Sequence, residues 1–148
     1  MKTHDLKYWI ERPMNSEHDW IDNAPNWIDS YVMSVNHPHR QLILDEIAKL
    51  EPLNKILEIG CNTGPNLIRI HDAFPKVLLT GLDVSWKCIN KAKEYLPTAF
   101  LQAGDYHNLP FPSEYVDLIL SDAVLMYSNP DQINQAIKET IKVASKMP

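Results

Sequence analysis

Short apolar runs alternate with segments of helical character along most of this chain, and few folds accommodate that order. The runs occupy residues 55–59, 77–82, 99–101 and 116–120. Short, continuous apolar runs are typical of strands that are buried on both faces of a sheet. The helical segments are long enough for crossovers, so the sequence predicts an α/β fold with a doubly wound, mostly parallel sheet, right-handed connections and helices on both faces.

The helices are marked by their first residues. Pro38, Pro65 and Pro130 each suit the first turn of a helix, and Ser85 can cap another. In three of these helices the apolar residues recur at helical spacing, which predicts the face that each helix buries. The expected buried residues are Leu42, Ile43, Ile47 and Leu50 after Pro38, Ile89, Ala92 and Leu96 after Ser85, and Ile133, Ile137, Ile141 and Ala144 after Pro130.

Composition excludes several classes of partner. The 148 residues fit one soluble globular domain, with 45% hydrophobic and 22% charged residues. The net charge of −5 includes no cluster of Lys or Arg, which disfavours nucleic acid as a partner. We expect no membrane segment and no metal site, because no apolar run could span a bilayer and Cys61 and Cys88 lack metal-type spacing. Without a recognisable secretion signal, a cytoplasmic location is expected.

The first 36 residues differ from the rest of the chain. They contain three of the four tryptophans, Trp9, Trp20 and Trp27, but no continuous period of 2 or 3.6. We expect residues 1–36 to form an arm that packs its aromatic side chains on the core of a domain at residues 37–148. The same arm is a candidate lid over a ligand site, since such segments often close pockets.

Turn-forming and polar residues follow the predicted strands, where open parallel sheets bind their ligands. After the first strand, Gly60 and Gly64 permit a sharp turn and a close approach of the backbone to a ligand, and the next helix directs its N-terminal amides there. Asp83 follows the second strand, where a carboxylate can accept hydrogen bonds from two ribose hydroxyls; the alternative is a turn aspartate before Ser85. The third and fourth strands are followed by Gly104-Asp105-Tyr106 and by Ser121-Asp122.

Three segments together resemble the successive motifs of class I S-adenosylmethionine-dependent methyltransferases, nearest to the broad group that modifies small molecules. The segments read ILEIGCNTGPN, GLDVS and LQAGDYHNLPFPSEYVDLILSDAVL, and the resemblance covers residues 37–146. It implies a Rossmann-like sheet with strand order 3-2-1-4, S-adenosylmethionine as the cofactor and a small molecule as the methyl acceptor.

The resemblance also implies which residues contact this cofactor. Asp83 would hold the ribose hydroxyls, Val84 would pack on adenine, and Asp105 would meet the adenine amino group. The first loop would surround the methionine moiety, Tyr106 would flank the base, and Ser121 would line the floor near the sulfonium. The complete expected set is Glu58, Gly60, Cys61, Asn62, Gly64, Asp83, Val84, Asp105, Tyr106 and Ser121.

Two departures from the family pattern bear on these expectations. Asn62 stands where many members have a third glycine, but asparagine tolerates left-handed backbone angles, so the loop can keep its shape. The sequence stops at Pro148, near the start of a fifth strand, whereas the family continues with three more strands that often contribute to the acceptor site. We therefore expect a fold that is truncated at its C-terminus relative to the family.

Methyl transfer places few demands on the protein, because the methyl group of the sulfonium is already activated. A general base is needed only when the acceptor must lose a proton, and the candidates by residue type are His37, His39 and His107. His107 is the best placed of these, and Tyr127 is a candidate for contact with the acceptor. An ordinary packing or surface role is the alternative for each.

Two other functions fit parts of the sequence. A nicotinamide-dependent oxidoreductase also has an acidic residue after its second strand, but its fingerprint has three glycines spaced G-x-G-x-x-G, and only Gly60 and Gly64 are present here. A protein that binds the cofactor without catalysis, such as a regulatory fragment, would carry the same motif residues. Turnover would distinguish it from a small-molecule methyltransferase, which is the function that the sequence predicts.

The strand at 116–120 leads to a first testable prediction. If it is the last strand of the sheet, its outer amides and carbonyls lack partners, and Asp117 is the single charge in the run that protects it from pairing with other strands. We expect this edge to be covered by a second copy of the chain in a homodimer, by the N-terminal arm, or by a strand of a longer protein. Light scattering should show a dimer in the first case. A monodisperse monomer whose amides at 116–120 exchange rapidly with solvent would contradict the prediction.

Overall fold

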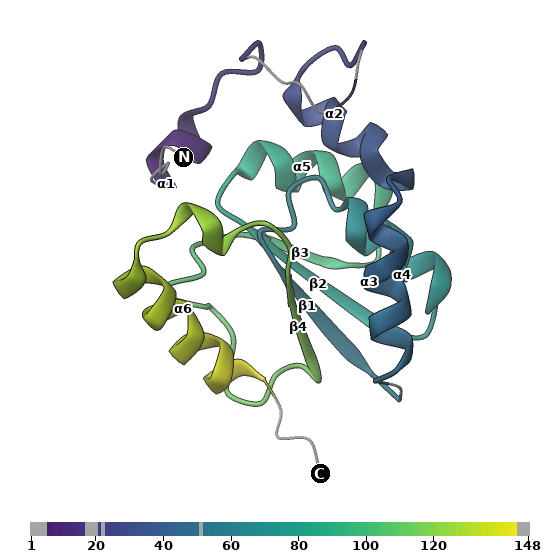
Figure 1. Cartoon of the computed structure of the whole chain (residues 1–148), viewed down its shortest axis with the longest axis vertical. Helices are drawn as coiled ribbons and strands as arrows, with labels where there is room; N and C mark the ends of the chain where they lie inside the picture. The colour runs from purple at the N-terminus through teal and green to yellow at the C-terminus, as the bar shows by residue number, and fades with distance from the viewer. Residues whose placement is uncertain (1–5, 17–20, 22, 51, 145–148) are drawn as a thin grey trace.

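The computed structural model describes residues 6–16, 21, 23–50 and 52–144. Its helices and strands alternate as the sequence predicts (Figure 1). In chain order they are α1 (Leu6–Glu11), α2 (Trp27–Met33), the 3-10 helix η1 (Ser34–Asn36), α3 (His39–Ala48), β1 (Lys55–Ile59), α4 (Pro65–Ala73), β2 (Leu78–Asp83), α5 (Trp86–Tyr95), β3 (Phe100–Ala103), β4 (Leu118–Ser121), the 3-10 helix η2 (Leu125–Tyr127) and α6 (Pro130–Val143).

The four strands form one parallel sheet in the order β3-β2-β1-β4, which confirms the predicted fold class and strand order. β1 lies in the interior, where Leu57 is opposite Thr80 of β2 and Ile119 of β4. The predicted bounds of β1 are confirmed, and the other strands begin one or two residues later than predicted. Because all strands run in the same direction, their carboxyl ends meet at one edge of the sheet.

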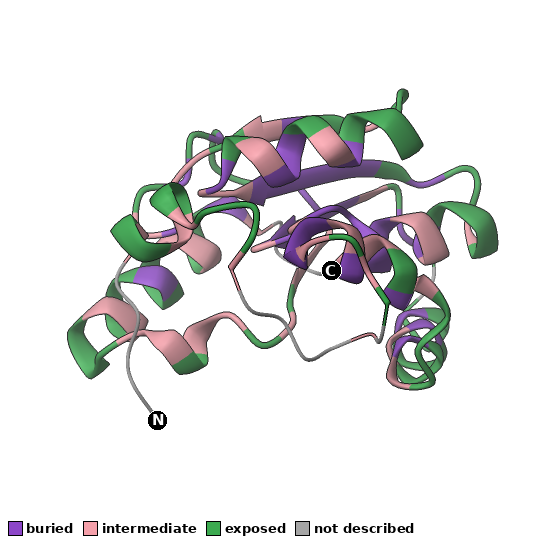
Figure 2. Cartoon of the chain, turned by 90° about the horizontal axis from the view of Figure 1, so that it is seen from above, coloured by how far each residue is buried: buried purple, intermediate pink, exposed green. Residues whose placement is uncertain are grey.

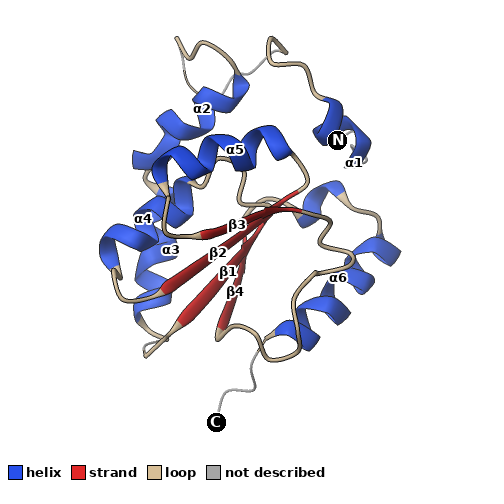
Figure 3. Cartoon of the chain, turned by 180° about the vertical axis from the view of Figure 1, so that it is seen from behind, coloured by secondary structure: helices blue, strands red, loops and turns tan. Residues whose placement is uncertain are grey.

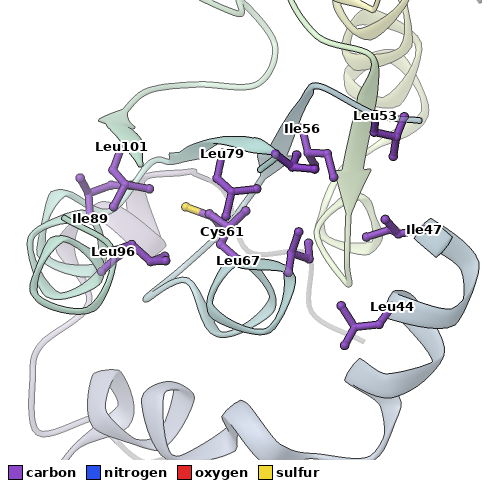
Figure 4. Packing of buried hydrophobic residues seen from close by; sticks show 13 residues of the cluster. Leu44, Ile47, Leu53, Ile56, Cys61, Leu67, Leu79, Ile89, Leu96 and Leu101 are labelled. Carbon is purple, nitrogen blue, oxygen red and sulfur yellow. The ribbon is translucent and has the colours of Figure 1, made fainter. Parts of the chain in front are cut away.

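Helices cover both faces of this sheet. On one face, α3, α4 and α5 pack around a core that includes Ile56, Leu67 and Leu96 (Figure 4). On the other face, α6 and the segment 104–116 pack over Leu57. Buried residues are concentrated in the strands and on the inner sides of the helices (Figure 2). The predicted buried residues of α5 are confirmed, since its apolar stripe lies in the first core.

The predicted buried face of α3 is wrong in part. Leu42 is 66% exposed and Leu50 is 41% exposed, whereas Leu44 and Ile47 are buried. Arg40 takes the remaining place on the inner face, at a helical spacing of four and seven residues from Leu44 and Ile47. Hydrogen bonds from its guanidinium to neighbouring elements hold that side of the helix inward, so a polar residue determines the rotation of α3.

The predicted buried face of α6 is also wrong in part, since only Ile133 and Ala144 of the four predicted residues are partly buried. Ile137 and Ile141 are 46% and 72% exposed, and the buried residues are Ala136 and Val143. Glu139 accepts a hydrogen bond from the Leu109 amide at 3.0 Å, on the segment that packs under the helix. This backbone contact turns the small and polar residues of α6 inward, which periodicity alone does not indicate.

The edge of β4 is only partly paired within the described chain. Val116 forms an isolated parallel bridge with Ala144, and the amides of Tyr115 and Val116 donate to Val143 O at 2.7 and 3.3 Å. The carboxylate of Asp117 lies on the β1 side, where it accepts hydrogen bonds from the amides of Asn54 and Lys55 at 2.7 and 2.9 Å. In the described ranges, the arm helices α1 and α2 lie at the carboxyl ends of the strands and not along β4 (Figure 3). Coverage by the arm is therefore wrong for these helices, while coverage by a second copy or by a longer protein stays a prediction. Of the helices that the structure describes, none is long and apolar enough to cross a membrane.

Candidate functional site

A cavity opens at the carboxyl ends of the strands. Its lining comes from the ends of β1, β2 and β4, the loop after β3, the first turns of α3, α4 and α5, and the arm helices α1 and α2. The bottom of the cavity includes Glu58 and Ile59 at the end of β1. This is the edge at which open parallel sheets bind ligands.

The loop after β1 brings its backbone close to this cavity. Gly60 and Gly64 have φ angles of +71° and +79°, and Asn62 has a φ of +51°, so the expectation that asparagine can replace a third glycine is confirmed. The amides of Gly60 and Cys61 donate to Leu82 O at 2.7 and 3.0 Å, which ties the loop to β2. A Cβ atom at Gly60 would overlap the side chain of Val124. Glycine at residue 60 is therefore required for the loop to pack directly against the residues that follow β4.

Asp83 joins the first two strand ends. Its Oδ2 accepts from the Asn62 amide at 2.9 Å, and its Oδ1 accepts from the Ser85 amide at 2.8 Å. Burial raises the pKa of Asp83, and these two hydrogen bonds oppose the shift. Asp83 thus acts as a turn aspartate before Ser85 and also presents a carboxylate to the cavity.

Glu58 is a buried carboxylate with an incomplete set of partners. It is 2% exposed, and its Oε1 accepts from Asn66 Nδ2 at 2.7 Å. Its Oε2 is buried without a hydrogen-bond partner among the described residues. Burial raises the pKa of Glu58 to about 8, against the opposing effects of the Asn66 hydrogen bond and the charge of Arg40. A buried polar atom without a partner is costly, and it is a reason to expect a ligand there.

Arg40 anchors the same cluster from α3. It is 3% exposed; its Nε donates to Ser34 O at 2.9 Å, its Nη2 to Ser34 Oγ at 2.7 Å, and its Nη1 to Asn66 Oδ1. Burial lowers the pKa of Arg40, although the charges of Glu58 and Asp122 oppose this. The sequence prediction missed Arg40, and the available signal was its helical spacing from Leu44 and Ile47.

The end of β4 contributes a second polar pair, whose members Asp122 and His39 were each singled out from the sequence but were not predicted to meet. His39 Nε2 lies 3.1 Å from Asp122 Oδ2, and both side chains are about one-third exposed and line the cavity. The same Oδ2 accepts from Asn66 Nδ2 at 3.2 Å. His37 Nδ1 lies 2.6 Å from His39 Nδ1 on the exposed side. The start of α3 and the end of β4 therefore meet over the first turn of α4.

The N-terminal arm closes one side of the cavity with aromatic rings. Trp9, Trp27 and Tyr31 line it, and the Trp9 ring lies edge-on to Tyr127 at a centroid distance of 5.1 Å. Trp27 is 1% exposed and donates from Nε1 to Pro13 O at 2.9 Å. Burial raises the pKa of Tyr31 to about 12. Trp20 lies outside the described residues.

The structure brings most of the predicted site residues together. Those that line the cavity are Glu58, Gly60, Cys61, Asn62, Asp83, Val84 and Tyr106, and Tyr127 is there as well. Gly64, Asp105, Ser121 and His107 are not part of the lining. Gly64 caps α4, and Asp105 Oδ1 is 2.7 Å from His107 Nδ1, which holds these two side chains against each other. The proposed roles of all these residues stay predictions.

Known proteins are similar in sequence to the part of the chain that forms the cavity. Residues 56–146 match the family model described as a methyltransferase domain. The chain is 33% identical over 116 residues to malonyl-[acyl-carrier protein] O-methyltransferase from Anoxybacillus flavithermus, an alignment that covers 68% of this chain and 44% of that protein. It is 32% identical over 78 residues to trans-aconitate 2-methyltransferase from Escherichia coli O1:K1, with coverage of 53% and 31%. The chain thus spans less than half the length of each of these relatives.

The fold is shared as well. The plantazolicin methyltransferase BpumL, in complex with a pentazolic desmethylPZN analog and SAH, superposes with a TM-score of 0.65 at 22% identity, covering 80% of this chain and 48% of that chain. At that identity the likeness concerns the fold alone. The family match extends from β1 to the end of α6 and contains the glycine loop, Asp83 and the end of β4. The chain therefore belongs to the methyltransferase domain family, among the class I S-adenosylmethionine-dependent methyltransferases.

Proposed function

We propose that this protein is an enzyme that transfers a methyl group from S-adenosylmethionine to a small-molecule acceptor, with the cavity at the strand ends as its active site. The proposal rests mainly on the loop after β1. This loop passes between the Asp83 carboxylate and Val124, in a conformation that only glycine at residue 60 permits. Two relatives named for methyl transfer to small acids or their carrier-bound form support it.

The residues around the cavity fit this cofactor. The orphaned Oε2 of Glu58 suits the ammonium group of its methionine end, and the Asp83 carboxylate suits the ribose hydroxyls. Val84 and Tyr106 offer an apolar surface and an aromatic surface for adenine. When bound, the cofactor supplies a methyl group that is already activated as a sulfonium, so the chain has to bind, align and exclude water.

Further parts of the proposal concern the role of the N-terminal arm, the cell compartment and the oligomeric state. We infer that residues 1–36 act as a lid, because Trp9, Trp27 and Tyr31 lie in the cavity wall while Trp27 is anchored to Pro13. We also propose a cytoplasmic location, which the two buried free thiols, Cys61 and Cys88, support. A homodimer through the β4 edge remains part of the proposal.

A second candidate function is cofactor binding without turnover. The chain spans less than half of each curated relative, and a partial domain can retain the cofactor site alone. Release of S-adenosylhomocysteine from the purified chain supplied with S-adenosylmethionine and a metabolite extract would support the enzyme. Binding without any release under these conditions would favour the alternative.

The first prediction of this proposal concerns Asp83. Asp83→Ala should weaken the binding of S-adenosylmethionine by roughly ten- to a hundredfold, because a carboxylate that grips two hydroxyls contributes roughly 1.5–3 kcal/mol. Titration calorimetry measures the affinity, and a melting curve verifies that the variant folds. Asp72→Ala, at an exposed position of α4, is the matched control and should leave the affinity unchanged. Asp105→Ala should cost less than Asp83→Ala, because the predicted partner of Asp105 is a single neutral amine. Equal affinities of the wild type and folded Asp83→Ala would remove the ribose assignment.

A second prediction concerns the space beside Gly60. Gly60→Ala should lower cofactor affinity by at least about tenfold, because the new methyl group overlaps Val124 and the left-handed backbone becomes strained. The double variant Gly60→Ala/Val124→Ala removes the overlap and should recover part of the loss, with helix content by circular dichroism as the control for folding. If the double variant binds no better than the single variant, the overlap with Val124 does not explain the loss.

A third prediction follows from the buried carboxylate of Glu58. Its pKa of about 8 lies above the ordinary value of 4.5, so the folded protein binds a proton that the unfolded chain releases, and stability falls as the pH rises from 4.5 to 8. Glu58→Gln keeps an oxygen for Asn66 and carries no charge. It should therefore be more stable than the wild type at pH 9, by roughly 2–5 kcal/mol, with little difference near pH 4.

Urea denaturation at several pH values measures this difference for Glu58→Gln. Glu46→Gln, on the exposed side of α3, is the control and should show no such pH dependence. The same Glu58 variant should bind S-adenosylmethionine at least about tenfold more weakly if the carboxylate holds the ammonium group. A stability difference that is constant with pH would show that Glu58 titrates normally.

A further inference from the structure

The carboxyl end of β4 is separated by the β1 loop from most residues proposed to bind the cofactor. In the order β3-β2-β1-β4, Tyr106, Asp83 and Gly60 follow the first three strands, whereas Asp122 follows β4. Asp122 nevertheless lines the same cavity. A ligand group held by Asp122 therefore lies on the other side of the β1 loop from the proposed ribose and adenine contacts.

Asp122 is fixed in position and keeps one oxygen for a ligand. Its Oδ2 accepts from Asn66 Nδ2 and pairs with His39 Nε2, at 3.2 and 3.1 Å. No described residue donates a hydrogen bond to its Oδ1. The next residue, Ala123, has a φ of +57°, a left-handed conformation that costs an alanine roughly 1 kcal/mol and is typical of functional sites. The fold thus holds the Asp122 carboxylate at the cavity wall despite the strained backbone of Ala123.

The ionisable groups of the cavity favour a cation over an anion beside Asp122. Glu58 lines the same cavity, but its Oε2 is already proposed to hold the ammonium group of the cofactor. Arg40 is also part of the lining, but all three of its nitrogens donate to Ser34 or Asn66. His39 is paired with Asp122 itself. An anionic acceptor would face the Asp122 carboxylate without a basic side chain available in the described lining, whereas a protonated amine would find a partner in Asp122.

The wall of the cavity also contains aromatic side chains. Trp9 and Tyr31 of the arm and Tyr127 after β4 line it, and the Trp9 and Tyr127 rings are in contact, with a centroid distance of 5.1 Å. Aromatic faces bind flat rings through large contact areas and attract cations through their quadrupoles. Arg12 illustrates this attraction, because its guanidinium lies 5.5 Å from the centroid of the Trp9 ring without being part of the cavity lining.

We propose that Asp122 binds the amino group of the methyl acceptor, and that this acceptor is an amine with an aromatic ring that packs against Trp9, Tyr31 and Tyr127. His39 and Asn66 act as positioning residues, because they fix the Asp122 carboxylate and leave its Oδ1 for the amine. The inference rests on the proposed function for the reaction, while the amine site is defined by the Asp122 carboxylate and the aromatic side chains of the cavity alone.

Benzylamine and benzoate provide the test, because they share a ring and differ in charge. The full chain is saturated with S-adenosylhomocysteine, and the affinity of each probe is measured by NMR titration. Benzylamine should bind at least tenfold more tightly than benzoate, and Asp122→Asn should reduce this ratio to below threefold. Asp72→Asn, an exposed carboxylate on α4, changes the net charge equally and should leave the ratio unchanged.

Two results would overturn the inference. One is a wild-type protein that binds benzoate as tightly as benzylamine. The other is an Asp122→Asn variant that keeps the benzylamine preference. If that variant also loses affinity for S-adenosylhomocysteine, Asp122 belongs to the cofactor site. If the wild type does not bind S-adenosylhomocysteine at all, the proposed function fails, and the ratio of the two probe affinities on the free protein still decides whether the amine site exists.

Discussion

The hydrogen bond between Asn66 and the buried carboxylate of Glu58 is the interaction on which the site depends. Glu58 ends β1, and Asn66 lies in the first turn of α4, so the bond joins strand and helix across the glycine loop. The same Asn66 amide also bonds Arg40 of α3 and Asp122 after β4. The side chain of Asn66 thereby connects four separate segments of the chain. Without it, the buried carboxyl group of Glu58 and the buried guanidinium of Arg40 would lose their shared partner, and a buried polar or charged group without partners is destabilising.

This arrangement has a cost in stability that apolar packing would avoid. The cavity end of the fold contains a buried carboxylate with a raised pKa, an arginine with a lowered pKa and an alanine in a left-handed conformation. The opposite end of the sheet is built from ordinary apolar contacts around residues such as Ile56 and Val116. Part of the backbone strain and one unpartnered carboxyl oxygen therefore lie at the cavity, as is common at functional sites, although Glu114 before β4 is left-handed as well.

The sequence was sufficient for the elements whose signals are local. The glycine loop, the start of α6 at Asn129-Pro130 with its capping box, and the buried stripe of α5 were each predicted from neighbouring residues, and the structure contains them. The faces of α3 and α6 could not be predicted in the same way. Their rotation depends on hydrogen bonds to residues remote in sequence, from Arg40 to Asn66 and from Leu109 to Glu139. The apolar periodicity of a helix indicates which residues could be buried. It does not indicate which hydrogen bonds to other segments determine the face that is buried.

The same distinction applies within the site. Residues after β1 and β2 were predicted to line the cavity because strand ends share one edge in a parallel sheet, and that rule places Gly60 and Asp83 correctly. His39 escaped this reasoning as a cavity residue, because its position depends on the connection before β1 and on its pairing with Asp122, 83 residues away.

Asp105 shows the reverse case. It follows β3 as the rule requires, but its carboxylate turns to His107, two residues further along, and leaves the cavity wall to Tyr106. A strand end thus determines where a side chain starts, and local hydrogen bonding determines where it points. For that reason the functional assignment of a carboxylate at a strand end depends on its hydrogen-bond partners. Asp83 accepts from the loop after β1, whereas Asp122 accepts from a side chain of α4.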